Sequence, residues 1–168
     1  MTETVSHIAV KQLNGFKSSK PNLTFKTLPG VNISKDERDC LVIEAPRISK
    51  QKIVTNDIVK ITDESSFEWL GRYDNVINSG GIKLYPEVIE SKLQDVISER
   101  FFVTSMPDDT LGEKLVLVVE SQKNKSLEKT TFKGLDKYEV PKEIIIVPKF
   151  VESISGKVQR CKTLQLVK

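Results

Sequence analysis

Residues 71–90 read GRYDNVINSGGIKLYPEVIE, and this stretch decides how the second half of the chain folds. Gly80 and Gly81 separate two short apolar segments, and glycine adopts the positive φ angles of a tight hairpin at little cost. Tyr85 precedes a proline, which favours extended backbone, and Pro86 suits the first turn of a helix. The stretch predicts a β-hairpin followed directly by an α-helix, although an ordinary connection from strands to a helix would have the same local pattern.

The predicted helix has one apolar face, whose residues recur at helical spacing: Ile89, Leu93, Val96 and Ile97. Short apolar runs predict strands at 41–43, 53–54, 58–61, 67–70, 101–106, 114–120 and 143–147. Turns are predicted at 55–57 and 107–109, a loop at 121–130, and short helices at 132–138 and 158–164. The chain is therefore β-rich up to Leu70 and mixes α and β from Asp74 onward, which predicts an α+β fold with a domain boundary between them.

Length and composition limit the classes of protein to consider. The chain has 168 residues with 38% hydrophobic and 29% charged residues, which fits a folded, soluble protein of one or two small domains. Neither a bilayer-spanning apolar run nor a secretory leader is recognisable, so we expect no membrane association. Cys40 and Cys161 lie far apart and match no zinc or redox spacing, which favours a reducing, cytoplasmic location.

The charged and catalytic residue types point toward phosphate chemistry. The net charge of +3 is too small for a dedicated nucleic-acid binder, and we expect no nucleic-acid partner. Lysines gather near both ends of the chain, either as solvated surface or as a lining for phosphates. With His7 as the only histidine and without a Walker or Rossmann motif, lysine, arginine, carboxylates and backbone amides remain to carry any chemistry.

Three separated segments resemble motifs of the AMP-forming acyl- and aryl-CoA ligases, the superfamily shared with luciferases and the adenylation domains of peptide synthetases. Residues 1–3 (MTE) resemble the end of its Tyr-Gly-Met-Thr-Glu motif, and residues 71–90 resemble its hinge motif. Residues 147–160 (VPKFVESISGKVQR) resemble its terminal motif, which contains the catalytic lysine. The three segments occur in the family's order, which strengthens the resemblance.

The resemblance covers the whole chain but only the C-terminal part of the family. It implies that residues 1–72 are the β-rich end of a large nucleotide-binding domain and that residues 73–168 are a mobile C-terminal α+β domain. The family's phosphate loop and most of its substrate pocket are not in this sequence. We therefore expect a missing N-terminal body, no activity from the chain alone, and dimerisation or aggregation through an exposed β edge.

The activity implied by the resemblance is ATP-dependent acid–CoA ligation, with ATP, AMP, CoA, Mg²⁺ and a carboxylic acid as the bound species. Residues 2–9 (TETVSHIA) and 54–59 (VTNDIV) are most similar to the o-succinylbenzoate–CoA ligases of menaquinone biosynthesis. Another acyl- or aryl-CoA synthetase is the alternative within the class. A non-catalytic module that binds CoA or nucleotide is the alternative outside it.

The resemblance assigns the adenylation residues as follows. Lys157 would be the catalytic lysine that contacts the carboxylate and phosphate oxygens. Thr2 would bind a phosphate oxygen and Glu3 would hold Mg²⁺. Asp57 would accept hydrogen bonds from the ribose hydroxyls, with Asn56 keeping the turn that glycine makes in the family, and Arg72 would lie near the ribose. Without the resemblance, Lys157 would be a solvated lysine, and Thr2 and Glu3 would belong to a frayed terminus. Asp57 would lie in a polar turn, and Arg72 would form a surface ion pair.

The remaining assignments concern the second half-reaction. Asp74 would be the hinge about which the C-terminal domain rotates. Gly80, Gly81 and Lys83 would then face the pantetheine arm and a phosphate of CoA. His7 would touch the acyl substrate. Alternatively, Gly80, Gly81 and Lys83 form an ordinary surface hairpin, and His7 has only an incidental position.

Overall fold

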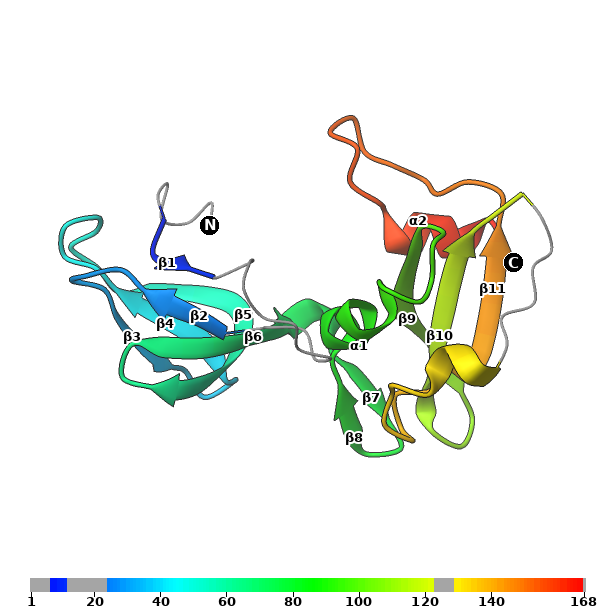
Figure 1. The fold of residues 1–168 in the computed structure, drawn as a ribbon, viewed down its shortest axis with the longest axis horizontal. Helices are drawn as coiled ribbons and strands as arrows, with labels where there is room; N and C mark the ends of the chain where they lie inside the picture. Colours follow the sequence, from blue (N-terminus) through cyan, green and yellow to red (C-terminus); the bar gives the residue numbers. More distant parts are fainter. Residues whose placement is uncertain (1–6, 12–23, 123–128, 168) are drawn as a thin grey trace. The chain divides into compact units, whose positions relative to one another are not determined.

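In the computed structural model, the chain folds into two compact units that divide after Asn75 (Figure 1). The structure describes residues 7–11, 24–122 and 129–167. Both units are built on β-sheets, and the second also contains two α-helices, so the predicted α+β class is confirmed. A short 3-10 helix, η1 (Tyr73–Asn75), ends the first unit at the point where the composition changes.

The first unit is a six-stranded antiparallel sheet. Its strands are β1 (Ala9–Val10), β2 (Thr24–Thr27), β3 (Asn32–Lys35), β4 (Cys40–Glu44), β5 (Ile53–Asp63) and β6 (Ser66–Arg72). Their order across the sheet is β1-β2-β6-β5-β4-β3, which places β5 and β6 near its centre. The buried core combines aliphatic side chains with Phe67, which stacks on Phe25 with ring centroids 5.5 Å apart.

The prediction of a turn at 55–57 is wrong, because these residues lie within β5, a continuous strand of 11 residues. Asn56 does not need left-handed backbone: Asp39 is the one non-glycine residue with positive φ among those that the structure describes. Just after residues 55–57, the register of β5 against β6 shifts between Ile58 and Val59. Polar side chains at 55–57 therefore lie along a strand.

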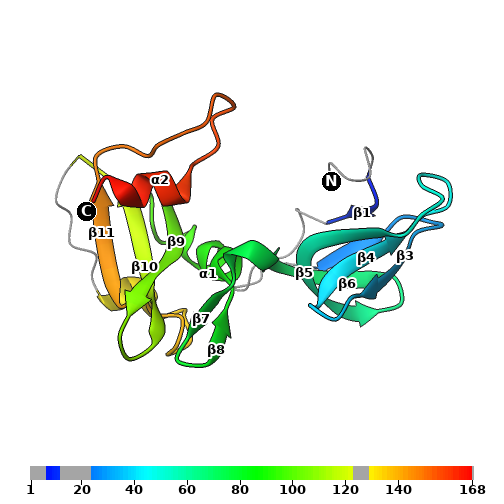
Figure 2. The same cartoon turned by 180° about the vertical axis from the view of Figure 1, so that it is seen from behind.

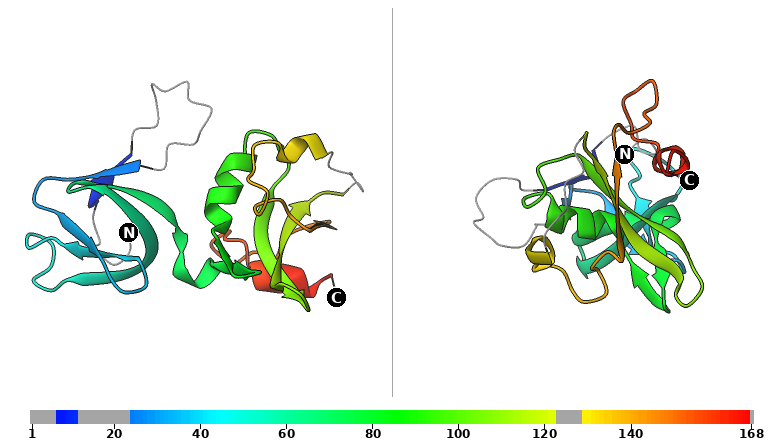
Figure 3. Two further views of the ribbon diagram at one scale, coloured as in Figure 1. Left: turned by 90° about the horizontal axis from the view of Figure 1, so that it is seen from below. Right: turned by 90° about the vertical axis from the view of Figure 1, so that its right-hand side faces the viewer.

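The second unit is a five-stranded sheet covered on both faces. Its strands are β7 (Ile77–Ser79), β8 (Ile82–Leu84), β9 (Phe101–Asp108), β10 (Gly112–Glu120) and β11 (Glu143–Val147). α1 (Pro86–Leu93) and the 3-10 helix η2 (Lys129–Phe132) lie on one face, and α2 (Arg160–Gln165) lies on the other (Figures 2 and 3). Because β10 pairs antiparallel with β9 and parallel with β11, it forms the centre of the unit.

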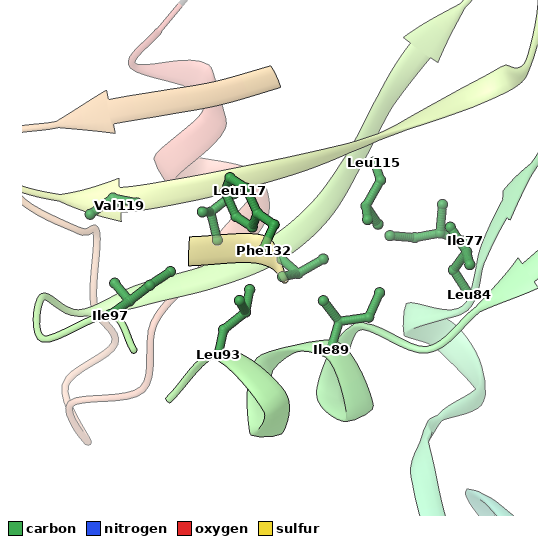
Figure 4. Close-up of a cluster of buried hydrophobic side chains, with 10 residues drawn as sticks. Ile77, Leu84, Ile89, Leu93, Ile97, Leu115, Leu117, Val119 and Phe132 are labelled. Atoms are coloured by element: carbon green, nitrogen blue, oxygen red, sulfur yellow. The ribbon is translucent and has the colours of Figure 1, made fainter. Parts of the chain in front are cut away.

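Alternate residues of β10 enter two different cores. Leu115, Leu117 and Val119 face α1 and η2, where they pack against Ile89 and Leu93 (Figure 4). Val116 and Val118 point to the opposite face and pack beneath α2 in a second cluster. Successive side chains of a strand point to opposite faces of its sheet, so burial on both sides requires the continuous apolar run of this segment.

The hairpin and helix predicted from residues 71–90 are confirmed. β7 and β8 join through Gly80 and Gly81, whose φ angles are +57° and +82°, and α1 begins at Pro86 after an extended Tyr85. The predicted apolar face is only partly right. α1 ends at Leu93, so Val96 falls in the following turn and is 58% exposed, whereas Ile97 is buried.

Three other predicted boundaries are wrong. β9 extends through Pro107, which is compatible with a proline because β9 pairs only with β10 among the described strands. η2 ends at Phe132, where a helix was predicted to begin, and the Phe132 ring packs into the buried cluster beneath it. α2 begins at Arg160, two residues later than predicted at 158. Within the described ranges, no helix has the length and apolarity required to span a bilayer.

Candidate functional site

Asp57 lies at the centre of a polar cluster at one end of the first unit. It is 9% exposed, and its Oδ1 accepts hydrogen bonds from Trp69 Nε1 at 3.1 Å and Arg72 Nη1 at 3.5 Å. The arginine is the direct cross-strand partner of Asp57 in the β5–β6 register, so the pairing of two strands brings the two predicted residues together. This contact is also the ion pair that the alternative, non-functional interpretation of Arg72 predicts.

The backbone at Asp57 is fixed by Thr55. The Thr55 hydroxyl donates to the carbonyl of Leu41 at 2.9 Å and accepts from the N–H of Asp57 at 3.1 Å. Because Thr55 is itself buried, these bonds hold the carboxylate at a set place on the strand. Such a rigid carboxylate is suited to accepting a pair of hydroxyl groups.

A pocket of about 380 Å³ adjoins this carboxylate. Its walls are mostly apolar, and Asp57 and His7 add the polar groups; the lining residues are His7, Ile8, Ala9, Phe25, Leu41, Asp57, Phe67 and Trp69. The structure therefore brings His7 and Asp57, two predicted site residues 50 positions apart, to one pocket, where an organic ligand would meet aromatic walls.

Asp74, the predicted hinge residue, is exposed and lies in η1 beside the same strand. Its Oδ2 accepts a hydrogen bond from Asn56 Nδ2 at 3.2 Å. Asn56 in turn accepts from Arg38 Nη1 at 3.0 Å, and the Arg38 guanidinium lies 5.2 Å from the centre of the Tyr73 ring. Asp57, Arg72 and Asp74 are thus linked through β5 and the end of β6.

In the second unit, the glycine hairpin presents Lys83 to solvent. Lys83 lies opposite Asn78 in the β7–β8 register and is exposed. Glu113 of β10 supports this hairpin, since its Oε2 accepts the Asn78 N–H at 2.9 Å while its Oε1 accepts the Ser105 hydroxyl at 2.6 Å. A Cβ added to Gly81 would meet nothing within 4 Å, so this turn leaves bare backbone open to a ligand.

Lys157 lies on a second hairpin, residues 152–158, which we call the Lys157 hairpin. A bridge between Glu152 and Val158 closes its base, and Gly156 turns the chain with φ of +77°. Ser153 ties the tip together: its carbonyl accepts from Gly156 N at 2.9 Å, and its hydroxyl accepts from Lys157 N at 3.1 Å. The lysine is exposed at the end of a defined turn.

The two hairpins project from opposite ends of the second unit. Figures 1 and 2 show the β7–β8 hairpin at the lower end and the orange-to-red segment between β11 and α2 beyond the upper end. The segments that carry Lys83 and Lys157 therefore lie at different ends of this unit. The unit therefore has two separate surfaces, each with an exposed lysine.

Two of the predicted residues, Thr2 and Glu3, lie outside the described residues. Within 7–11, 24–122 and 129–167, no group of three His, Cys, Asp or Glu residues is placed to hold a metal ion. The residues predicted for the site did not include Trp69, Arg38 or Glu113. The only available signal for Trp69 was its alternation with Phe67 on a predicted strand.

No protein-family model matches the chain. A 2-succinylbenzoate–CoA ligase from Listeria monocytogenes is 31% identical over 112 residues, which cover 64% of this chain and 24% of that protein. An AMP-forming acyl-CoA synthetase/AMP-acid ligase II-like protein from Dyadobacter fermentans is 36% identical, with a TM-score of 0.52 over 100% of this chain and 49% of that one.

The chain is homologous to AMP-forming acyl- and aryl-CoA ligases. Its fold also matches an o-succinylbenzoate coenzyme A synthetase from Bacillus subtilis, solved with ATP and magnesium, with a TM-score of 0.77 and 22% identity over 98% of this chain and 40% of that one. The chain spans about a quarter of the length of the curated ligases that it matches, 24% in the Listeria example. These proportions fit the C-terminal part of such a ligase.

Proposed function

We propose that the chain forms the C-terminal part of an ATP-dependent acid–CoA ligase that acts in the cytoplasm. In the first half-reaction a carboxylate oxygen attacks the α-phosphorus of ATP, and pyrophosphate leaves. In the second, the CoA thiol attacks the acyl carbon, AMP leaves, and the thiol proton is released. Residues 1–72 contribute part of the nucleotide site, and residues 73–168 act as the mobile domain.

The observation that carries this proposal is the placement of Lys157 and Lys83 on two hairpins at opposite ends of one compact unit. A two-step ligase needs a cation during adenylation and a different surface for the arriving thiol. Rotation of the unit about Asp74 would exchange one hairpin for the other without refolding either. Hinges of this kind are a few residues at the ends of elements, as in η1.

For adenylation, we assign Lys157 to the negative charge that develops between the carboxylate and the α-phosphate. A cation held on a turn stabilises that charge with little reorganisation, and loss of one such group typically costs about 10²–10³ in rate. Asp57 and Arg72 lie beside the ribose in this proposal, with Thr2 at a phosphate oxygen and Glu3 at the metal. His7 borders the acyl group from the pocket that it shares with Asp57.

For thioester formation, Gly80 and Gly81 provide a turn without side chains along which the pantetheine arm passes. Lys83, the middle residue of β8, meets a phosphate of CoA. The positive φ angles at both glycines mean that residues with side chains would be strained there. The assignment therefore depends on the backbone as much as on the lysine.

We propose o-succinylbenzoate as the acid, which would place the ligase in menaquinone biosynthesis. The similarity to 2-succinylbenzoate–CoA ligases favours it, whereas a similar 2,3-dihydroxybenzoate-AMP ligase keeps another aryl acid as the alternative. Thioester formation by the complete ligase across succinylbenzoate, hydroxybenzoates and fatty acids decides between them. Preference for a fatty acid would exclude both aryl assignments.

The role of each lysine is tested by separating the half-reactions in the complete ligase. Lys157→Ala is expected to lower pyrophosphate release by about 10²–10³ while thioester formation from supplied acyl-adenylate is retained. Lys83→Ala is expected to show the reverse pattern. Lys149→Ala removes another exposed lysine nearby and serves as the control. Equal loss of both half-reactions in Lys157→Ala would contradict the division of roles.

A non-catalytic module that binds nucleotide or CoA is the second candidate, favoured by the pocket beside Asp57. The chain contains one tryptophan, and Trp69 donates directly to Asp57. AMP binding to the full chain should therefore alter tryptophan fluorescence, and Asp57→Asn should weaken the binding of AMP. Tight binding by a protein whose complete form makes no thioester would favour the module over the ligase.

A further inference from the structure

The direction of the Lys157 hairpin is set at its base. Within its tip, hydrogen bonds join Ser153 to Ser155, Gly156 and Lys157. Ile154 is fully exposed and contributes no buried apolar contact. These bonds define the shape of the turn but not where it points.

Arg100 holds the first arm of the hairpin. Its guanidinium pairs with Glu152 at the hairpin base and with Glu120 at the end of β10, the latter at 3.0 Å. It also lies 5.5 Å from the centre of the Phe150 ring, while Glu120 accepts the Phe150 N–H at 3.1 Å. The hydrogen bond to Glu152 raises the pKa of the Arg100 guanidinium above its usual value. Arginine is cationic throughout the physiological range in any case, so the pair keeps its charge.

Arg160 holds the second arm, two residues after Val158. Its Nη2 lies 2.9 Å from Glu90 Oε1 in α1, and its Nη1 donates to the carbonyl of Val103 at 2.9 Å. The guanidinium also lies 5.6 Å from the centre of the Phe102 ring. A planar cation with several fixed donors is better suited than an ammonium group to joining such partners.

Thr163 joins the two arms beneath the hairpin. It is completely buried, and its Oγ1 accepts the Val151 N–H at 3.1 Å while donating to the Gln159 carbonyl at 3.0 Å. Gln159 N also donates to the Val151 carbonyl at 2.8 Å. The arms therefore move as one body, and each arm is tied to the sheet or to α1 by an arginine.

We infer that Arg100 and Arg160 are positioning residues for adenylation, which fix both ends of the Lys157 hairpin so that the ammonium group reaches the reacting phosphate. The inference rests on the proposed function. The contribution of such residues lies in geometry, and misplacement of a reacting group by about 1 Å can cost as much as 10²-fold in rate. A purely structural role would instead lower stability and affect both half-reactions equally.

The test measures both half-reactions in the complete ligase and hydrogen exchange in the same variants. Glu152→Gln removes a charge from an exposed side chain, so folding should be retained. We expect kcat for adenylation to fall about 10-fold at unchanged KM, with thioester formation from supplied acyl-adenylate unaltered. The Gly156 and Lys157 amides should exchange faster. Arg100→Lys, which keeps the charge, should restore part of the rate that Arg100→Ala loses.

Glu143→Gln is the matched control, because it breaks the 2.7 Å ion pair with Lys114 in the same unit, away from the hairpin. It should leave adenylation and hairpin exchange unchanged. If Lys157→Ala abolishes adenylation but Glu152→Gln and Arg160→Lys do not alter it, the positioning inference is overturned and the proposed function stands. If Lys157→Ala has no effect on adenylation, the proposed function itself fails.

Discussion

Asn56 and Asp74 are joined by a 3.2 Å hydrogen bond from Nδ2 to Oδ2, which ties the middle of β5 to η1 at the end of the first unit. The bond continues through Arg38, which donates to Asn56 and covers the Tyr73 ring. The segment proposed as the hinge is therefore held by side chains from β5 and from the turn between β3 and β4. Its rotation would have to break these contacts.

Asn56→Ala is expected to loosen η1 without unfolding the unit. One hydrogen bond contributes about 1 kcal/mol, so local opening should increase roughly fivefold. Hydrogen exchange at Asp74 and Asn75 measures this opening in the full chain. Asn32→Ala, on the exposed edge strand β3, supplies a control that should leave the exchange unchanged. Equal exchange in Asn56→Ala and the unsubstituted protein would show that the bond does not restrain the hinge.

The local constraints of residues 80–86 explain why the hairpin and helix could be predicted. Two glycines, a residue before proline and a proline each restrict the backbone independently of the rest of the fold. β2 and β3 were missed because their sequences, TFKT and NISK, bury little and gain their structure from neighbouring strands. Tertiary pairing, rather than local preference, decides such segments.

The candidate site was predicted through motif resemblance, but its supporting contacts could not be. Trp69 reaches Asp57 across the β5–β6 pair, whose register shifts between Ile58 and Val59. Arg160 and Glu90 are 70 residues apart, and nothing local in either segment indicates the other. Partners of this kind depend on topology, which a single sequence does not specify.

The two units should unfold separately. Leu117 is completely buried in the second unit, and truncation of such a leucine typically costs about 2–5 kcal/mol. Leu117→Ala should therefore lower the unfolding midpoint of circular dichroism, whereas the fluorescence of Trp69, which lies in the first unit, should keep its midpoint. Ile43→Ala, in the core of the first unit, should give the opposite result. A common shift of both signals in either variant would indicate one cooperative unit.

Glu113 should matter for the glycine hairpin and hence for thioester formation. Glu113→Gln replaces the carboxylate by an uncharged amide with one acceptor oxygen, so the Asn78 N–H loses its charged acceptor. Bonds to charged acceptors contribute about 1.5–3 kcal/mol, and exchange of the Asn78 amide should rise about tenfold or more. Ser105→Ala removes only the second partner and should affect Asn78 less. In the complete ligase, a larger loss of adenylation than of thioester formation would contradict this role.

Glu90 should make the stability of the protein depend on pH. The sign of this dependence shows whether burial or the ion pair with Arg160 has the larger effect on the pKa of Glu90. Burial raises the pKa of the Glu90 carboxyl above its usual 4.5, although Arg160 and the Val103 N–H favour the charged form. Because the folded protein then holds this proton more tightly than the unfolded chain, the free energy of unfolding contributed by Glu90 falls as the pH rises through the raised pKa. Glu90→Gln cannot titrate, so the stability of the unsubstituted protein relative to this variant should decrease as the pH rises above the ordinary pKa of 4.5. Urea unfolding of both proteins across this range measures the difference. An increase with pH would mean that the pairing with Arg160 outweighs burial and lowers the pKa of Glu90 in the folded protein.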